Sequence, residues 1–399
     1  MKRGWQTRKL GDICNFEGGS QPPKSKFIFE EKPGYVRFLQ IRDFRSDKNI
    51  TYIPESKKNS LCEANDILIG RYGASVGKIL TNKAGAYNVA MMKAIPNFEI
   101  LNRSWFYNYL ISDEFQSRLL KVADRSAQAG FSKDDIFNFP VPIPPLSEQQ
   151  RIVGLLDEAF DGIATAKANA EKNLQNARAL FESHLQSVFT QRGKGWVEKK
   201  LGEICSFLNR GISPRYLESG GICVLNQKCI RDHRVSFEPS RRHDINDKKV
   251  GTERLVQAGD VLVNSTGTGT LGRVAQLRDT PAEPTTIDSH VTIVRPIPGM
   301  FFTEFFGYML VFIENGIKEA GEGCGGQTEL ARSVLAEKFS VSYPISLADQ
   351  KQYVAKLDGL SEETQRLARI YDRKIAALRA LKKSLLHQAF TGELTKVAA

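Results

Sequence analysis

Apolar residues recur at alternating spacings of three and four in two long stretches of the chain. The first stretch has apolar or small residues at Ile152, Leu156, Ala159, Ile163, Ala166, Ala170, Leu174, Ala177, Phe181, Leu185 and Val188. The second has Leu357, Leu360, Thr364, Leu367, Tyr371, Ile375, Leu378, Leu381 and Leu385. This pattern predicts two coiled-coil helices, and a helix of about 40 residues would be ~60 Å long.

Two such helices have two ways to bury their apolar stripes. Each helix could pack only on its neighbouring domain, or the two helices could cover each other. Because a small domain does not cover a rod of ~60 Å, the pattern favours an antiparallel coiled coil. We expect this pair to hold the rest of the chain as two domains at opposite ends, related by a pseudo-twofold axis. Ser147 and Gln150 also predict a capping box at the start of the first helix.

The segments outside these helices predict an α+β fold. Short β-branched and aromatic runs at 35–41, 66–69, 260–263 and 290–294 alternate with Gly, Pro and Asn turn signals, as is typical of strands. Apolar residues at helical spacing predict one helix at 105–120 and another at 303–320.

The chain repeats itself in four places, always in the same order. The segments 5–14 and 196–205 both carry Trp, Leu-Gly and Ile-Cys, and 66–77 and 260–272 share an Asp, an apolar run and two glycines. The segments 144–157 and 345–358 match, as do 183–190 and 384–391. The predicted parts are therefore a mixed domain at 1–145, a helix at 146–191, a second mixed domain at 192–345, a second helix at 346–392 and a tail at 393–399.

Charge and composition narrow the class of partner. The chain of 399 residues has 56 Lys and Arg against 45 Asp and Glu, a net charge of +11. This balance favours a polyanionic partner, nucleic acid above all, because neutralising phosphates releases counterions. No apolar run approaches the roughly 20 residues of a membrane span, so we expect a cytoplasmic protein. The six cysteines form no CxxC pair, and Cys14 and Cys205 are interpreted as small core residues rather than nucleophiles.

Motifs of catalytic chemistry are weak. The segment 267–272 spells GxGxxG, but residues 273–277 after it predict a strand, whereas a dinucleotide site needs a helix there. Gly77-Lys78 lacks the spacing and hydroxyl of a phosphate loop, and Glu198 with its lysines is interpreted as surface charge. The five histidines show no metal-ligand spacing, so no metal is predicted. No Asn-Pro-Pro or Asp-Pro-Pro followed by an aromatic residue occurs, so adenine methylation would need a partner.

The segments 144–153 (PPLSEQQRIV) and 382–395 (KKSLLHQAFTGELT) resemble the motifs of type I restriction-modification specificity subunits, and the repeated Trp, Leu-Gly and Gly-Asp-Val-Leu elements are similar to target recognition domains of that family. The resemblance covers essentially the whole chain, although Pro344-Ile-Ser-Leu-Ala-Asp departs from the first copy of the motif.

The resemblance implies a non-catalytic protein with two target recognition domains. Each domain would read one half of an interrupted double-stranded DNA target, and the two helices would dock two methyltransferase (modification) subunits. No cofactor is expected on this chain; those partners would carry S-adenosylmethionine and methylate adenine. Restriction subunits, which translocate DNA, would join with ATP and magnesium.

Residues that read different half-sites should differ between the repeats and carry groups that reach phosphates or base edges. In the first half the candidates are Lys24, Lys26, Gln40, Arg42, Arg71, Tyr72, Lys78, Arg125 and Gln128. In the second half they are Asn209, Arg210, Arg215, Tyr216, Gln227, Lys228, Arg231, His233, Arg234, Arg241, Arg242, Arg273 and Gln327. The alternative for each is ordinary solvated surface. Two other functions stay open: a coiled-coil scaffold that does not read DNA, and a nuclease or methyltransferase in one chain.

Overall fold

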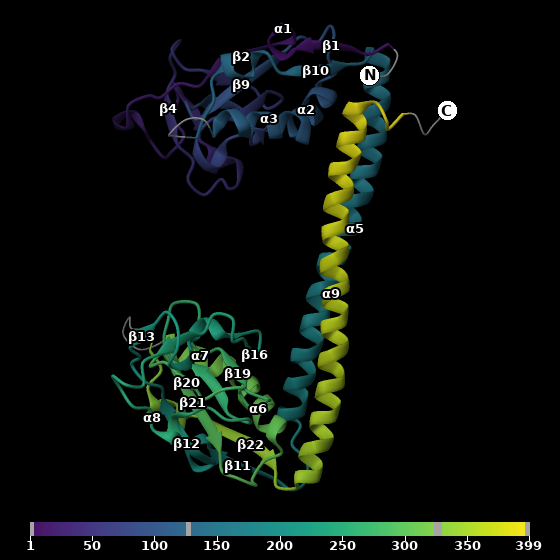
Figure 1. The fold of residues 1–399 in the computed structure, drawn as a ribbon. Coiled ribbons are helices and arrows are strands. Elements are labelled where there is room, and N and C mark those ends of the chain that lie inside the picture. Colours follow the sequence, from purple (N-terminus) through teal and green to yellow (C-terminus); the bar gives the residue numbers. More distant parts are fainter. Residues whose placement is uncertain (1–3, 125–128, 323–328, 396–399) are drawn as a thin grey trace. The chain divides into compact units, whose positions relative to one another are not determined.

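The computed structural model describes residues 4–124, 129–322 and 329–395. It divides into two compact units, residues 1–171 with 372–399 and residues 172–371. Figure 1 shows that each unit is a mixed globular domain joined to helical segments. Along the described chain, no helix is both long and apolar enough to cross a membrane.

The strands of unit 1 are β1 (Gln6–Lys9), β2 (Cys14–Gly18), β3 (Tyr35–Leu39), β4 (Tyr52–Pro54), β5 (Leu61–Cys62), β6 (Ile67–Gly70), β7 (Ile79–Leu80), β8 (Gly85–Tyr87), β9 (Met91–Pro96) and β10 (Pro140–Ile143). They form sheets in the orders β2-β9-β6-β7, β4-β3-β8-β5 and β1-β10. The short helices are α1 (Leu10–Ile13), α2 (Arg103–Ile111), α3 (Asp113–Ala123) and α4 (Lys133–Phe137).

Unit 2 repeats this plan. Its strands are β11 (Trp196–Lys200), β12 (Cys205–Arg210), β13 (Tyr216–Leu217), β14 (Ile222–Leu225), β15 (Ile230–Arg231), β16 (Arg234–Val235), β17 (Arg241–His243), β18 (Val261–Asn264), β19 (Val274–Gln276), β20 (Thr285–Ile287), β21 (Val291–Pro296) and β22 (Ser340–Pro344). The sheet β12-β21-β18-β19 matches β2-β9-β6-β7 of unit 1, and β14 pairs in parallel with β20 as β3 does with β8. The helices are α6 (Thr303–Phe312), α7 (Glu314–Glu322) and α8 (Arg332–Lys338).

The two long helices are α5 (Leu146–Thr190) and α9 (Leu347–Thr391), each of 45 residues. In unit 1, Ile152 and Leu156 of α5 share one apolar core with Leu386 and Phe390 of α9. The end of α9 therefore packs beside the start of α5, so the two helices run antiparallel there. Unit 2 has the reverse arrangement, since Leu185, Val188 and Phe189 from the end of α5 share a core with Val354 and Leu357 from the start of α9.

The predicted α+β class and the antiparallel helix pair are confirmed, but three local predictions are wrong. The helix predicted at 105–120 is two helices, α2 and α3, because Ser112 between them has extended backbone angles. The helix predicted at 303–320 is likewise divided into α6 and α7 at Ile313. In both cases the apolar spacing continues across the break, so periodicity does not reveal it.

The third wrong prediction is the capping box at Ser147. The helix α5 begins at Leu146, so Ser147 already lies inside it, and the carbonyl of Pro145 accepts from the N–H groups of Glu148 and Gln149. At the equivalent place before α9, the Ser346 hydroxyl accepts from the Asp349 N–H at 3.2 Å. The serine cap thus exists in the second repeat, two residues earlier than the first repeat predicted, because Ser346 corresponds to Pro145 and not to Ser147.

Candidate nucleic-acid interface

One corner of each unit has the same backbone hydrogen bonds in both repeats but different side chains. We define this polar corner as residues 40–42, 70–78, 88–90 and 129–131 in unit 1, and as 226–228, 264–273, 288–290 and 329–330 in unit 2. The backbone frame is the same in both units: the N–H of Gly70 donates to Lys78 at 2.8 Å, and that of Asn264 donates to Arg273 at 2.9 Å. The two corners therefore present different side chains from one framework.

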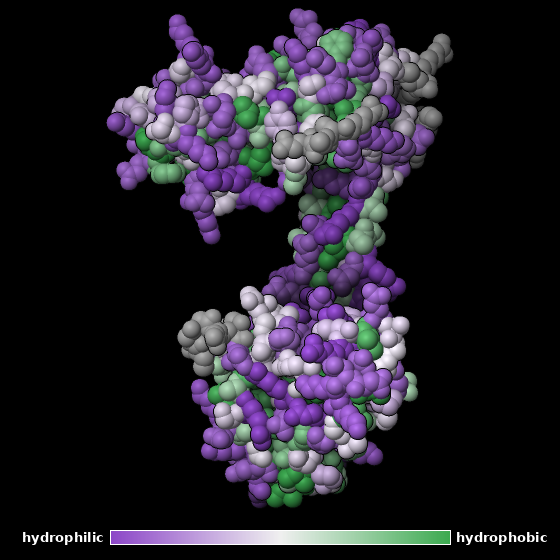
Figure 2. Space-filling view, turned by 60° about the vertical axis from the view of Figure 1, so that its left-hand side comes forward, coloured by the Kyte–Doolittle hydropathy of each residue, from purple (hydrophilic) through white to green (hydrophobic). Residues whose placement is uncertain are grey.

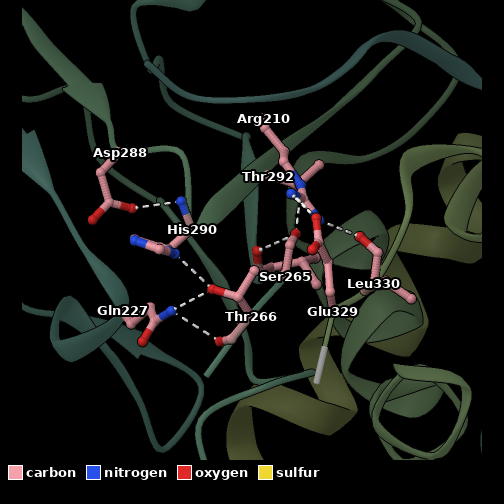
Figure 3. A network of polar contacts seen from close by, with 10 residues as sticks. Arg210, Gln227, Ser265, Thr266, Asp288, His290, Thr292, Glu329 and Leu330 are labelled. Carbon is pink, nitrogen blue, oxygen red and sulfur yellow. Dashed lines mark hydrogen bonds and ion pairs between the residues drawn. The ribbon is translucent and has the colours of Figure 1, made fainter. Parts of the chain in front are cut away.

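The corner of unit 2 is a connected polar network (Figure 3). The Gln227 side chain donates from Nε2 to the carbonyl and hydroxyl oxygens of Thr266, at 2.9 and 2.7 Å. The Thr266 hydroxyl also lies 2.7 Å from Nδ1 of His290. The His290 N–H donates to Oδ1 of Asp288 at 3.0 Å, and burial raises the pKa of this carboxyl above its ordinary value.

Arg210 bonds to residues 329–330, the last segment of the polar corner of unit 2, which we call its closing segment; residues 129–131 are the closing segment of unit 1. Its Nη2 donates to the carbonyl of Leu330 at 2.7 Å, and its Nη1 pairs with the Glu329 carboxylate. Nearby, the hydroxyls of Ser265 and Thr292 lie 2.5 Å apart and are buried. The half-buried Arg210 side chain is thus held by a carbonyl and a carboxylate.

The corner of unit 1 has fewer polar contacts and a larger aromatic side chain. Arg71 donates from Nε to the carbonyl of Phe131 at 3.3 Å, and its guanidinium lies 5.0 Å from the centre of the Tyr72 ring. The Tyr72 side chain is 45% exposed. The Gln40 N–H donates to Oδ2 of Asp43 at 2.6 Å, which fixes the turn that leads to exposed Arg42.

Unit 2 has further basic residues on two separate strand pairs, β13 with β17 and β15 with β16. The Arg241 guanidinium stacks 3.4 Å from the centre of the Tyr216 ring, which orients an exposed arginine. The hairpin β15-β16 turns through Asp232 and His233, both at positive φ, and pairs Arg231 with Arg234. A two-residue turn of this kind is tight, so the arginine backbones lie side by side.

Known proteins share both the sequence and the fold of this chain. Residues 2–175 match the protein family "Type I restriction modification DNA specificity domain". The chain is also 24% identical over 247 residues to the MjaVIII specificity subunit of Methanocaldococcus jannaschii, a match that covers 58% of this chain and 56% of the relative. It is 30% identical over 175 residues to the EcoR124I/EcoR124II specificity subunit of Escherichia coli, covering 41% and 42%.

The matches thus span about half the length of these two specificity subunits. Solved structures extend the comparison to nearly the whole fold. A chain from work on complex assembly and conformational transition of the type I R-M system matches with a TM-score of 0.80 at 18% identity, covering 98% of this chain and 99% of the other. The HsdS subunit of Thermoanaerobacter tengcongensis matches with a TM-score of 0.56 at 18% identity, covering 99% and 98%. The predicted resemblance to type I specificity subunits is confirmed.

Several of the residues predicted to contact DNA are engaged with other groups of this chain. The partners are acidic for Arg215 (Asp247, 3.2 Å), Arg242 (Glu283, 2.6 Å) and His233 (Glu314, 3.1 Å), while Arg234 bonds to Gln365 of α9 and Arg273 to the carbonyl of Gly269. Lys78 and Asn209 are half-buried, and Lys24, Lys26, Lys228 and Arg231 are exposed. Arg125, Gln128 and Gln327 lie outside the described residues.

The sequence analysis missed several corner residues, among them Thr266, Asp288, His290 and Glu329. In the sequence, His290 has no other histidine or cysteine at a metal-ligand spacing, so it was not among the candidates. Aligning the repeats shows the missing signal, because Asp288 and His290 occupy the places of Asn88 and Ala90: the N–H of Asn88 donates to Leu39 as that of Asp288 does to Leu225.

The glycines at 267–272 lie in a turn between antiparallel β18 and β19, and the strand predicted after them is present as β19. In the described part of the chain, no three His, Cys, Asp or Glu residues are grouped so as to hold a metal. Burial raises the pKa of the Cys14 thiol and that of Cys205, the latter to about 12, which suits core residues rather than nucleophiles.

Proposed function

We propose that the chain is the DNA-recognition subunit of a type I restriction-modification complex and that each unit reads one half of a bipartite target. The observation that carries this proposal is the repeated frame of the polar corner with exchanged side chains. The equivalent pairs are Arg71 and Ser265, Tyr72 and Thr266, Lys78 and Arg273, Asn88 and Asp288, and Ala90 and His290. A constant frame with variable polar groups suits two readers of different base sequences.

Charge supports DNA as the ligand. The net charge is +11, and most of the surface visible in Figure 2 is hydrophilic. Among the candidates, Lys24, Lys26, Arg42, Lys228 and Arg231 are exposed, which suits contacts with phosphates. Arg241, which lies over the Tyr216 ring, is the candidate for a base edge, because its side chain is exposed and a guanidinium can bond to guanine.

The helices support two partner subunits. The helices α5 and α9 have equal length, and Leu180 and Leu381 stand at equivalent positions, 52% and 46% exposed. An exposed leucine at the same place in each repeat suits docking of two copies of one partner. We propose that these partners are modification subunits that bind S-adenosylmethionine and methylate adenine, that restriction subunits add to this complex, and that this chain itself is non-catalytic.

Reconstitution with the neighbouring methyltransferase tests this proposal. We expect a complex of one chain with two methyltransferase subunits that methylates DNA in a two-part sequence, measured by mass and by methylome sequencing. A stable one-to-one complex with full activity would contradict the two docking sites. The pure chain should shift random duplex DNA at low salt, which a scaffold would not do. Methylation or cleavage by the pure chain with magnesium and S-adenosylmethionine would contradict the non-catalytic role.

A further inference from the structure

Backbone hydrogen bonds align the two polar corners residue by residue. The N–H of Gly19 donates to Met91 and that of Gly211 to Val291, each at 3.0 Å. The residue before each glycine is therefore equivalent, so Gly18 in unit 1 stands where Arg210 stands in unit 2.

A second pair of bonds aligns the other strand. The N–H of Arg71 donates to Ala90 and that of Ser265 to His290, each at 2.8 Å. Arg71 of unit 1 therefore stands where Ser265 stands in unit 2. Each corner has one arginine and one small residue at these two positions, but in opposite places.

The two arginines nevertheless donate to equivalent backbone carbonyls, one in each unit. Tyr72 forms an antiparallel bridge with Gly130, and Thr266 forms one with Glu329, so the next residues, Phe131 and Leu330, are equivalent. Arg71 donates to the carbonyl of Phe131 at 3.3 Å, and Arg210 donates to that of Leu330 at 2.7 Å. Equivalent carbonyls in the two units thus accept a hydrogen bond from an arginine at different places. In unit 1 the arginine directly follows β6, and in unit 2 it is the last residue of β12.

The surrounding residues are exchanged in a matching way. A Cβ at Gly18 would lie 3.3 Å from Nη1 of Arg71, and a Cβ at Gly130 would lie 2.8 Å from the Tyr72 ring. Gly130 therefore leaves room for the Tyr72 ring, and Gly18 leaves room beside the end of the Arg71 side chain. In unit 2 the smaller Thr266 stands opposite Glu329, which pairs with Arg210.

We propose that Arg71 and Arg210 are alternative positioning residues that hold the segment closing each polar corner and do not themselves contact DNA. This inference rests on the proposed function, and it withdraws two residues from the predicted DNA contacts. The segment matters for reading because it also holds the glycine turn: the N–H of Gly73 donates to Ala129 at 2.8 Å. A loosened segment would therefore release Tyr72 and its neighbours from their places.

The different positions of the arginine in the two units suggest the variants that test this proposal. Arg71→Ser removes the guanidinium from unit 1, and Gly18→Arg combined with Arg71→Ser copies the arrangement of unit 2. The added side chain has room, because β2 is extended at Gly18 and a Cβ at this position would have only Nη1 of Arg71 within 4 Å. Arg42→Ser is the matched control for hydrogen exchange alone, since it removes the same charge from an exposed residue of the same unit, and Arg42 is itself a proposed phosphate contact.

The first readout is amide hydrogen exchange of the full chain across residues 129–139. We expect exchange about tenfold faster or more in R71S, because a charged hydrogen bond is lost. The rate should return toward that of the wild type in G18R/R71S and stay unchanged in R42S. Wild-type exchange in R71S, or no recovery in the double variant, would overturn the proposal. The reciprocal pair R210G and R210G/S265R repeats the test in unit 2, in case a unit 1 variant fails to fold.

The second readout is binding of the full chain with its methyltransferase to duplexes that carry the methylated target or a changed half-site. R71S should lose discrimination about tenfold at one half-site only, with an unchanged slope of affinity against salt, and G18R/R71S should restore the discrimination. A slope reduced by about 1 in R71S would instead mark a phosphate contact and overturn the proposal. Absence of discrimination in the wild type would refute the proposed function, while the exchange rates would still decide the positioning role.

Discussion

Replacing the buried Gln149 should loosen the packing of the start of α5 against the rest of unit 1. Its side chain is fully buried, and its Oε1 accepts from the N–H of Asn102 at 2.7 Å. Its Nε2 donates to the carbonyls of Ile100 and Pro144, both at 2.9 Å. Gln149→Ala would leave these three backbone groups without their partner in a dry place.

The expected cost follows from these bonds. An unsatisfied buried polar group costs about 1–3 kcal/mol, so three of them cost ~3–9 kcal/mol. This is a large share of the ~5–15 kcal/mol that stabilises a domain. For a unit of this size each kcal/mol lowers the melting temperature by about 2–4 °C, which predicts a fall of ~6 °C or more.

Calorimetry of the full chain measures this fall, with Gln150→Ala as the control. Gln150 follows Gln149 on α5 and is exposed, so its loss should cost about 0.5 kcal/mol or less. The repeat supplies a second test, because Gln350 is also buried and bonds to Phe302 at 2.8 Å and Pro344 at 2.8 Å. Gln350→Ala should destabilise unit 2 by a similar amount. If Q149A were no more destabilising than Q150A, the reasoning from buried bonds would be refuted.

Three further predictions follow from charge and length. Arg231→Ala should weaken binding of the target by ~1–3 kcal/mol, measured by titration; loss confined to one base pair marks a guanine contact, and uniform loss marks a phosphate contact. Asp288→Asn should raise the free energy of unfolding of unit 2 at neutral pH. Burial raises the pKa of this carboxyl in the folded state, so its ionisation at higher pH costs stability, and asparagine removes that cost. The difference between the variant and the wild type should therefore shrink below about pH 4, where the carboxyl is protonated in both states. An equal gain at both pH values would contradict this cause. Four residues inserted near Ala170 and four near Leu367 should widen the gap between half-sites by about one or two base pairs in the methylome; an unchanged gap in an active complex would show that the helices do not set it.

The large divisions of this fold were predictable because their signals are local and repeated. The seam of α5 and α9 depends only on spacing along the chain, and the duplication depends only on comparing one half with the other. Breaks such as Ser112 and Ile313 were not predictable in this way, since one changed backbone conformation leaves the apolar spacing intact. The pseudo-twofold relation between the two units stays a prediction.

The polar corners were predictable only in part. Residue type and variation between repeats pointed to Arg71, Tyr72, Arg210 and Gln227, but not to what they bond. Arg210 pairs with a glutamate 119 residues away, and that contact depends on how distant segments pack. Moreover, Arg71 of unit 1 bonds to the equivalent carbonyl from a different place in the sheet. No fixed spacing along the sequence therefore identifies the arginine that holds the closing segment.

The central claim is that two units read two half-sites independently. A chimera tests it most directly. In this chimera, residues 205–340 are replaced by the corresponding segment of a relative, and the methylome of cells that express it with its methyltransferase is sequenced. The account predicts that one half-site changes to that of the relative while the other half-site is kept. A change in both half-sites, or in neither while methylation remains active, would contradict it.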